Sequence, residues 1–184
     1  MGNDMRNFKE IIYRLRENVT TEELCRRGLK IGKNFSRMNQ VMIDDSHPWL
    51  ITIGDDVTLA PRVHILAHDA STKVHLGYTK IGCVTIGDRA FVGAESVILP
   101  GVTIGNDVII GANSTVTHDI PDGMVAVGSP ARVICTTEEY LQKEKERMQA
   151  CPVYGEDYTM RGGITEEMKT KQREEIGKTG GFVV

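Results

Sequence analysis

The sequence predicts an all-β core built as a parallel β-helix of hexapeptide repeats, and three observations support this. Residues 86–121 divide into six consecutive blocks of six residues without any insertion. Each block opens on Ile or Val, and four of the six blocks continue with Gly. The fifth position of every block is small or aliphatic: Ala90, Ser96, Val102, Val108, Ser114 and Ile120. A period of six fits neither an amphipathic helix nor a single long strand, so each block is expected to form a short strand followed by a corner.

The length of the repeat also predicts how the coils stack. Three blocks close one triangular coil, so eighteen residues return the chain to the same face one strand spacing higher, roughly 4.8 Å. Equivalent side chains such as Ile86 and Ile104, or Val92 and Ile110, should therefore stack in a shared core. The alternative, a β-sandwich with accidental spacing, would need hairpin turns, and this run offers few of them.

Composition narrows the class of protein. A chain of 184 residues is long enough for one domain, or for one domain with tails. A net charge of −3 gives no electrostatic signature of nucleic-acid binding. No run of 18 apolar residues predicts a membrane span, and the first residues lack the apolar segment of a signal peptide. The cysteines form no CxxC pair, so we expect free thiols in a reducing cytoplasm: Cys25, Cys83, Cys135 and Cys151.

Residues 1–28 are predicted to form an N-terminal helical segment. Apolar residues recur at helical spacing over residues 4–17 with charges between them. The Thr-Thr-Glu-Glu sequence at residues 20–23 is a capping box that opens a second short helix, and Gly28 would end that helix. Such a pair of helices could cap the open end of the β-helix or reach over a binding site.

Residues 29–135 are predicted to form the β-helix itself. The repeat begins irregularly, with Arg37 between Ile31 and Ile43, and becomes regular from Ile53. Ile65 and Ile86 are 21 residues apart, which is three more than a whole coil. We therefore expect residues 71–80 to protrude as a loop, with the shift in frame absorbed around Cys83.

Residues 136–184 are predicted to form a C-terminal helix and tail. Pro121 and Asp122-Gly123 indicate a turn, after which a short strand over 125–127 would close the last coil. The Thr-Thr-Glu-Glu sequence at residues 136–139 is another capping box, and it opens a charged helix to about Gln149. One more helical pattern follows in the tail: Ile164, Met168 and Ile176.

His68 is the strongest candidate for a catalytic residue. It occupies the fourth position of the block that begins at Ile65, on the rim of a coil and directly before the protruding loop. An imidazole has an ordinary pKa of about 6.5, so it can be neutral and accept a proton from a hydroxyl or an amine. The alternative is a surface histidine on a turn.

The repeat resembles the hexapeptide-repeat acyltransferases, which fold as left-handed β-helices. The left hand comes from that resemblance, because crossovers between parallel strands are right-handed in roughly 98% of cases. The segment Ile65-Leu-Ala-His68-Asp69-Ala-Ser-Thr resembles the catalytic segment of the maltose and galactoside O-acetyltransferase branch. There, a histidine just before a loop is the general base, which implies that role for His68. The resemblance covers roughly residues 30–136.

Two further segments resemble the same branch. Residues 39–44 match an Asn-x3-Ile/Leu-Asp segment whose Asn lines the acceptor site, which corresponds to Asn39 here. Residues 126–134 resemble a closing Gly-Asn-Pro-Ala-Lys-Val-Ile segment that lies along coenzyme A. This chain has Ser129 for Asn and Arg132 for Lys, and Asp69 follows the histidine instead of Pro. Residues 45–54 and 66–73 are similar to enzymes that O-acetylate capsular and cell-surface polysaccharides.

The resemblance implies an acetyl-CoA-dependent O-acetyltransferase acting on a hydroxyl of a sugar or polysaccharide building block. Acetyl transfer would be direct, with no cysteine nucleophile and no acyl-enzyme. The implied acceptor-binding residues are Asn39, Asp44, His47 and Asp69. The implied coenzyme A-binding residues are Gly93, Ala94, Gly111, Ala112, Ser129, Pro130 and Arg132. Corner geometry of the repeat is the alternative explanation for each of the small residues.

Some of these residues have open alternatives. His47 could line the acceptor cleft or belong to an irregular corner packed by Trp49, and Asp69 could orient an imidazole or cap the loop. The loop residues Lys73, His75 and Tyr78 could contact the acceptor, a neighbouring subunit or only solvent.

A second class of function is a zinc hydratase like the gamma-class carbonic anhydrases, which bind zinc through three histidines. His64, His68 and His75 raise this possibility, but the family pattern is a lone His followed much later by a His-x4-His pair. We therefore expect no metal site. A noncatalytic β-helix scaffold is the remaining alternative. The acyltransferase resemblance also implies a homotrimer, with Trp49 and the C-terminal tail as candidate intersubunit elements.

Overall fold

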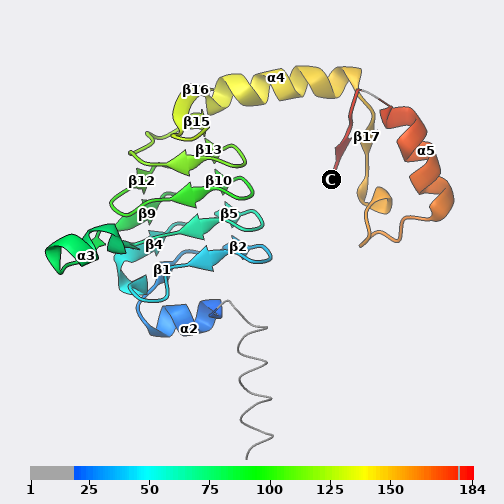
Figure 1. Ribbon diagram of the computed structural model, residues 1–184. Coiled ribbons are helices and arrows are strands. Elements are labelled where there is room, and N and C mark those ends of the chain that lie inside the picture. Colours follow the sequence, from blue (N-terminus) through cyan, green and yellow to red (C-terminus); the bar gives the residue numbers. More distant parts are fainter. Residues whose placement is uncertain (1–18, 178) are drawn as a thin grey trace, which may run out of the picture. The chain divides into compact units, whose positions relative to one another are not determined.

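A computed structural model of the chain describes residues 19–177 and 179–184 (Figure 1). The chain divides into two compact units, one that ends at Thr137 and one over Glu138–Val184. The helix predicted over residues 4–17 lies outside the described residues. Among the residues that the structure does describe, no helix has both the length and the apolar character needed to cross a membrane.

The first unit is a stack of short parallel strands arranged as three sheets, which form the three walls of the coil (Figure 1). The first wall contains β1 (Lys30–Ile31), β4 (Ile51–Ile53), β9 (Val84–Ile86) and β12 (Thr103–Ile104). The second wall contains β2 (Ser36–Arg37), β5 (Thr58–Leu59), β10 (Phe91–Val92), β13 (Ile109–Ile110), β15 (Met124–Val127) and β16 (Arg132–Thr136). The third wall contains β3 (Met42–Ile43), β6 (His64–Ile65), β11 (Val97–Ile98) and β14 (Thr115–Val116).

The predicted stacking is confirmed by the register of the strands. Ile86 pairs with Ile104, and Val92 pairs with Ile110, each in parallel. The side chains that open the blocks are buried, and fully burying an Ile or Val stabilises the fold by about 1.5–3 kcal/mol. The small residue at the fifth position of the block also has a structural role. The buried Ser114 hydroxyl, for example, donates to the Gly111 carbonyl inside the corner.

The corners use a left-handed backbone at the fourth position of the block. Over residues 19–177 and 179–184, eight non-glycine residues have a positive φ, and all of them stand at that position: Asn34, Gln40, Asp56, Arg62, Arg89, Glu95, Asp107 and Asn113. Side chains of the preceding corner residues link the coils. The Asp88 carboxylate accepts the backbone N–H of Asp55 at 2.8 Å, and the side-chain amide oxygen of Asn106 accepts the backbone N–H of Asp88 at 2.8 Å.

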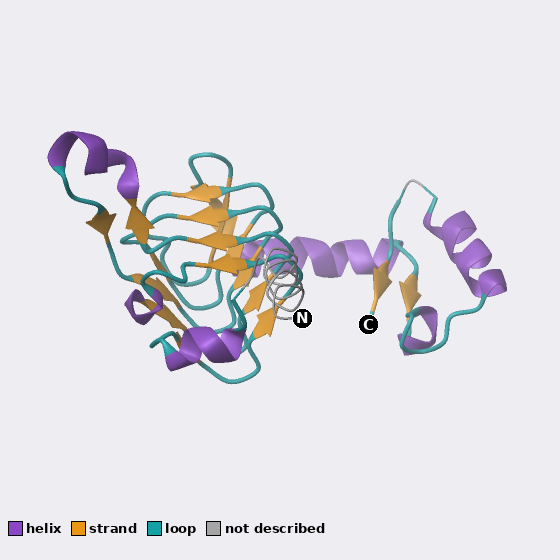
Figure 2. Ribbon diagram, turned by 60° about the horizontal axis from the view of Figure 1, so that its bottom comes forward, coloured by secondary structure: helices purple, strands orange, loops and turns teal. Residues whose placement is uncertain are grey.

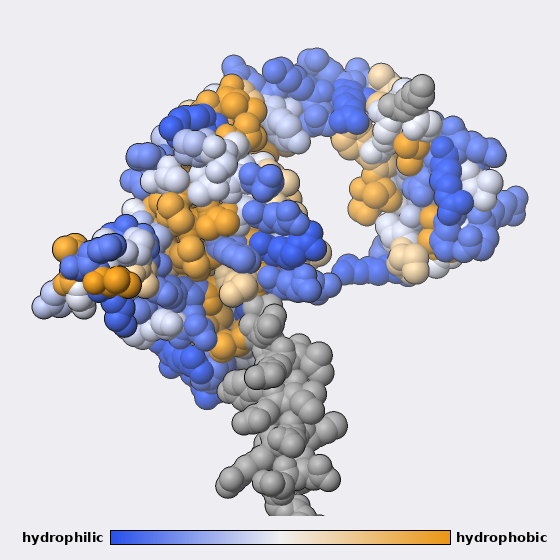
Figure 3. Space-filling view, in the orientation of Figure 1, coloured by the Kyte–Doolittle hydropathy of each residue, from blue (hydrophilic) through white to orange (hydrophobic). Residues whose placement is uncertain are grey.

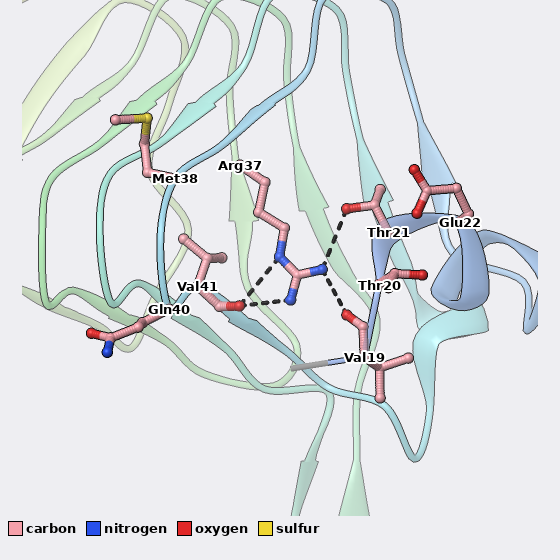
Figure 4. Close-up of a pocket in the computed structure, with 8 residues that line it drawn as sticks. All are labelled: Val19, Thr20, Thr21, Glu22, Arg37, Met38, Gln40 and Val41. Carbon is pink, nitrogen blue, oxygen red and sulfur yellow. Dashed lines mark hydrogen bonds between the residues drawn. The ribbon is translucent and has the colours of Figure 1, made fainter. Parts of the chain in front are cut away.

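The helix α2 (Thr21–Arg26) covers the open end of the first coil. The Thr20 hydroxyl accepts the N–H of Glu23, as the capping box predicts, and Leu24 is completely buried in the core. Arg37 occupies the core-facing position of the first coil, and its guanidinium donates to the carbonyls of Val41 and Val19 (Figure 4). The pocket around Arg37 therefore belongs to the contact between α2 and the first coil, which closes this end of the β-helix. Burial there lowers the pKa of Arg37.

The opposite end is closed by a short hairpin. β15 pairs in parallel with β13, as predicted for the strand over 125–127, and β16 turns back antiparallel to β15. The helix α4 (Thr137–Ala150) follows directly, at the second predicted capping box.

The second unit contains a parallel pair of strands and a helix. β17 (Val153–Tyr154) pairs with β18 (Phe182–Val183), a 3-10 turn covers Glu156–Tyr158, and α5 (Glu166–Ile176) contains the predicted Met168 and Ile176. The Tyr154 hydroxyl donates to the Glu175 carboxylate at 2.9 Å. Burial and this acceptor raise the pKa of Tyr154 to about 12.

The connections from the third wall to the first wall, which we call the third corner, differ from coil to coil. The regular corner from Ile98 to Ile104 takes six residues. Ile43 and Ile53 are ten residues apart, so four residues are extra there; they form a corner loop over residues 44–50 that includes a 3-10 turn at Pro48–Leu50.

The second coil carries a much longer insertion, and here the sequence-based count was wrong. Ile86 pairs with Ile53, so Ile65 and Ile86 lie on successive walls of adjoining coils. Their 21-residue separation therefore exceeds a regular side of six by fifteen residues, not by three. The whole connection over residues 66–83 forms an arm, which projects from the coils (Figure 2). It contains β7 (His68–Asp69), a 3-10 turn (Ala70–Thr72), α3 (Lys73–Leu76) and β8 (Lys80–Ile81).

Candidate active site

The corner loop and the arm meet at the third corner, where they bring together an aspartate and a histidine. The Nδ1 atom of His68 lies 2.5 Å from the Oδ2 atom of Asp44. The register explains this contact, because Ile43 pairs with Ile65 and the residues that follow them leave the third wall side by side. The insertion then replaces the left-handed turn that the fourth position takes in regular blocks, and His68 starts β7 instead.

The Asp44 carboxylate organises both insertions. Its Oδ2 atom also accepts the N–H of Ala67 at 2.8 Å, and its Oδ1 atom accepts the N–H groups of Ser46 and His47 at 3.0 and 3.1 Å. Its side chain is 0% exposed. Burial alone would raise the pKa of Asp44, but the hydrogen bonds from His68 and from these backbone groups outweigh that effect and hold the pKa below its ordinary value.

This arrangement fixes the tautomer of the His68 imidazole. An ionised carboxylate can only accept hydrogen bonds, so the Nδ1 atom of His68 carries the proton. The Nε2 atom of the neutral ring is then left with a free lone pair. The His68 side chain is 35% exposed, so a ligand can reach it. A histidine held in this way can act as a general base.

His47 and Asp69 flank His68 in different ways. The His47 ring lies 5.4 Å from the His68 ring, centroid to centroid. Asp69 accepts the N–H of Ser71 at 2.8 Å and pairs with Lys80 at 2.6 Å, and Lys80 lowers the pKa of Asp69. Of the two roles open to Asp69, capping is therefore the one that its contacts support, and the carboxylate that contacts the imidazole belongs to Asp44.

A pocket of about 160 Å³ lies against His68 on the side of the first coil. It is mainly apolar, and its lining residues are Val19, Arg37, Met42, Ile43, Asp44, Asp45, Ile65, Leu66 and His68.

The other predicted binding residues lie along the second corner, which joins the second wall to the third. Asn39 is exposed there, and its carbonyl accepts the N–H of Arg62 in the next coil. Because the second and third corners are opposite edges of the third wall, this chain does not bring Asn39 beside His68. The same edge carries the small residues predicted to contact coenzyme A: Gly93, Ala94, Gly111 and Ala112.

Glycine at this edge also has a packing role. A Cβ atom on Gly93 would lie 2.5 Å from the Ala112 nitrogen, so stacking of the coils requires a glycine there. The Ser129 hydroxyl donates to the Thr115 hydroxyl at 2.9 Å, which places the exposed Ser129 and Pro130 beside the last strand of the third wall. Arg132 starts β16 and donates to the Ala131 carbonyl.

The three histidines of the zinc alternative are not assembled. Within the described ranges, the one group of three possible metal ligands is Asp44, His47 and His68, with ligand atoms within 4.8 Å of one another. His64 points outward from β6 and lines a different pocket, and His75 lies on α3 in the arm. A hydratase site made of His64, His68 and His75 is therefore wrong for this fold.

Comparisons with known proteins show what this chain is similar to. The family described as "Bacterial transferase hexapeptide (six repeats)" matches residues 78–118. Protein CapG of Staphylococcus aureus is 34% identical over 143 residues, which cover 74% of this chain and 83% of CapG. Galactoside O-acetyltransferase of Escherichia coli (strain K12) is 42% identical over 113 residues, which cover 58% of this chain and 53% of that protein.

Solved structures show the same relationship. A galactoside acetyltransferase in complex with coenzyme A is 37% identical, with a TM-score of 0.55, over 62% of this chain and 58% of that one. A maltose O-acetyltransferase from Clostridium difficile 630 is 31% identical, with a TM-score of 0.52, over 71% of this chain and 85% of that one.

The fold and these relatives define a hexapeptide-repeat transferase. The chain belongs to the hexapeptide-repeat acetyltransferase family, which confirms the resemblance seen in its sequence. These neighbours imply a left-handed winding of the coils. The chain spans between half and two thirds of the length of the first curated relatives that it matches.

Proposed function

We propose that the protein is an acetyl-CoA-dependent O-acetyltransferase that acts on a hydroxyl of a sugar or polysaccharide building block. The observation that carries the proposal is the hydrogen bond between His68 and the buried Asp44, at the interrupted corner of a fold whose relatives are named acetyltransferases. Galactoside and maltose stand in the names of two of these relatives, which favours a sugar acceptor.

In the proposed reaction, the His68 Nε2 atom takes the proton of the acceptor hydroxyl as its oxygen attacks the thioester carbonyl. Asp44 stabilises the imidazolium that forms, and backbone N–H groups or a side-chain amide stabilise the oxyanion. The tetrahedral intermediate then expels the thiolate, which leaves readily because a thiol has a pKa of about 8.5, and the proton on Nε2 passes to it. The acetyl group moves directly, so no acyl-enzyme forms.

Residue roles around His68 follow from its surroundings. We assign the acceptor to the pocket beside His68, where His47 lies close and Asp69 holds the base of the arm through Lys80. We assign coenzyme A to the exposed second corner, where small side chains allow the pantetheine arm to lie close to the backbone. Its predicted contacts are Gly93, Ala94, Gly111, Ala112, Ser129, Pro130 and Arg132.

We also propose that the active unit is a homotrimer in the cytoplasm. His68 and the second corner lie on opposite edges of one wall, so a neighbouring copy could supply Asn39 and the coenzyme A contacts opposite His68. The arm has apolar side chains that such a neighbour would cover, because Val74, Leu76 and Ile81 are 91%, 67% and 59% exposed (Figure 3, left). Mass measurement in solution tests this, and a fully active monomer would contradict it.

The proposed activity is tested by measuring thiol release from acetyl-CoA with a panel of sugar and nucleotide-sugar acceptors. His68→Ala should lower turnover by a factor on the order of 10²–10⁴, because a positioned general base contributes that much. His118→Ala is the matched control, since His118 is exposed on the third corner of the fourth coil and contacts Thr117. Equal turnover in both variants would remove His68 as the base, and stoichiometric zinc without acetyl transfer would refute the function.

A further inference from the structure

Trp49, the one tryptophan of the chain, is held firmly beside the proposed active site while its side chain stays open to solvent. It lies in the corner loop and is 56% exposed. Its backbone is fixed from two sides. Pro48 is buried before it, and a Cβ atom on Gly28 would lie 2.8 Å from the Trp49 Cβ atom. An exposed indole on an ordered backbone is available to a ligand at little cost in conformational entropy.

Three rings follow one another from Trp49 to the proposed base. The ring of Trp49 lies 5.2 Å from that of His47, with a tilt of 54°, and the ring of His47 lies 5.4 Å from that of His68, with a tilt of 43°. The Asp44 carboxylate contacts both histidines, because one oxygen accepts the backbone N–H of His47 and the other contacts the Nδ1 atom of His68. The three rings therefore form one continuous row that ends at the proposed base.

One nitrogen of the His47 ring is buried without a hydrogen-bond partner. Among the described residues, its Nδ1 atom is the one buried side-chain nitrogen or oxygen without a hydrogen-bond partner. A buried ring nitrogen without a partner costs least when it carries no proton, so the proton of the neutral ring is placed on Nε2. From there it can be donated to a hydroxyl oxygen of a ligand.

We infer that His47 and Trp49 form an aromatic platform for a saccharide acceptor of two or more pyranose rings. This inference rests on the proposed function. A pyranose ring has an apolar face of C–H groups and a rim of hydroxyls, and the negative face of an aromatic ring attracts such C–H groups. The two ring spacings put Trp49 at most 10.6 Å from His68, as 5.2 plus 5.4 Å, a distance that a disaccharide spans. One sugar ring then presents its hydroxyl to His68 while the next lies on Trp49.

Steady-state kinetics with matched acceptors tests this platform. Trp49→Ala should raise KM for a disaccharide acceptor roughly two- to twelvefold, because an aromatic contact contributes about 0.5–1.5 kcal/mol. For the corresponding monosaccharide the rise should be smaller than twofold, and for the disaccharide kcat should fall less than KM rises. Trp49→Phe should restore most of the lost affinity, whereas Tyr140→Ala, an exposed aromatic on α4, should leave both KM values as in the wild type.

Intrinsic fluorescence gives a second measurement that does not require turnover. Because Trp49 is the sole tryptophan, titration with the disaccharide should change the emission of the wild-type protein, and the monosaccharide should change it much less. Equal KM effects for both acceptors, or emission that responds to subunit dissociation but not to saccharide, would overturn the platform. If the wild type releases no thiol yet its emission responds to the disaccharide, the proposed function fails and the platform stands.

Discussion

The third corner occurs in a regular and an interrupted form in the same molecule. From Ile98 to Ile104 the chain turns through Leu-Pro-Gly, with Gly101 at a φ of +87°. From Ile65 to Ile86 it makes the arm, yet both connections end on the same tripeptide, Val-Thr-Ile, at residues 84–86 and 102–104. The wall geometry is therefore equal in the two coils. The groups proposed to act in catalysis stand only where the chain departs from the repeat.

The largest effect should come from making the two corners alike. Replacement of residues 66–83 by Leu-Pro-Gly would connect Ile65 to Val84 as Ile98 is connected to Val102. We expect the variant to fold, because β9 is held by β4 and β12 on either side, and to lose acetyl transfer entirely with His68. Circular dichroism and thiol release measure the two properties. An unfolded variant would mean that the arm, and not only the stack, stabilises the fold.

Asp44→Asn should have the next largest effect. An amide can donate to His68 Nδ1 and so favour the tautomer with the proton on Nε2, which cannot act as a base. Turnover should fall by a factor on the order of 10²–10⁴, because the imidazole is then held in the wrong tautomer for a base. Asp119→Asn is the matched control, because the Asp119 carboxylate accepts the N–H of Thr103 on the third corner of the fourth coil and an amide oxygen can accept it equally well. Similar losses in both variants would contradict the orienting role.

The contribution of Asp44 to the unfolding free energy should decrease at acid pH. A carboxyl group whose pKa is lower in the folded state adds stability above its unfolded pKa of about 3.9, and this stability is lost as pH falls through the folded pKa. The wild type should therefore lose more of its unfolding free energy than Asp44→Asn as pH falls from 5 toward 3. Urea denaturation at several pH values measures this, and parallel curves for the two proteins would count against it.

The smallest expected effect is a difference in stability between the same substitution in the regular corner and in the arm. Gly101 and Gly77 have φ values of +87° and +75°, and an added Cβ atom would meet no neighbour at either. Alanine in a left-handed conformation costs about 1–2 kcal/mol. Gly101→Ala should lower the free energy of global unfolding by about that amount. Gly77→Ala, in the arm, should leave it nearly constant, because a projecting segment can open before the coils do. Equal shifts in urea denaturation would show that the arm unfolds together with the stack.

The sequence predicts the regular part of the fold well, because each block carries its own information. Ile at the first position and a small residue at the fifth are enough to place the stacked pair of Ile86 and Ile104. The size of the arm is harder to predict from the sequence. The 21-residue separation of Ile65 and Ile86 equals either a whole coil plus three residues or one side of a coil plus fifteen. Only the pairing of Ile53 with Ile86 decides between them, and this contact depends on atoms far apart in the sequence.

The candidate site was predicted in part for a similar reason. His68 stands out because it replaces a turn residue before an insertion. The partnership with Asp44 was missed, and Asp69 was considered for that role instead. The signal was present in the register, because Ile43 lies under Ile65 and Asp44 follows Ile43 directly. The insertion that contains His47 and Trp49 is hard to recognise in the sequence. The apolar residues Leu50 and Ile51 follow it and resemble a continued repeat.

The parallel stacking of the coils has a consequence for how such a protein can change over evolution. Every strand at the interrupted corner is aligned by the strands above and below it, so its place does not depend on the length of the chain that joins it to its neighbour in sequence. Lengthening that connection from six to 21 residues adds only roughly 1 kcal/mol of closure entropy. Insertions and deletions at this corner can therefore change the surface beside His68 while the stacked strands keep their positions.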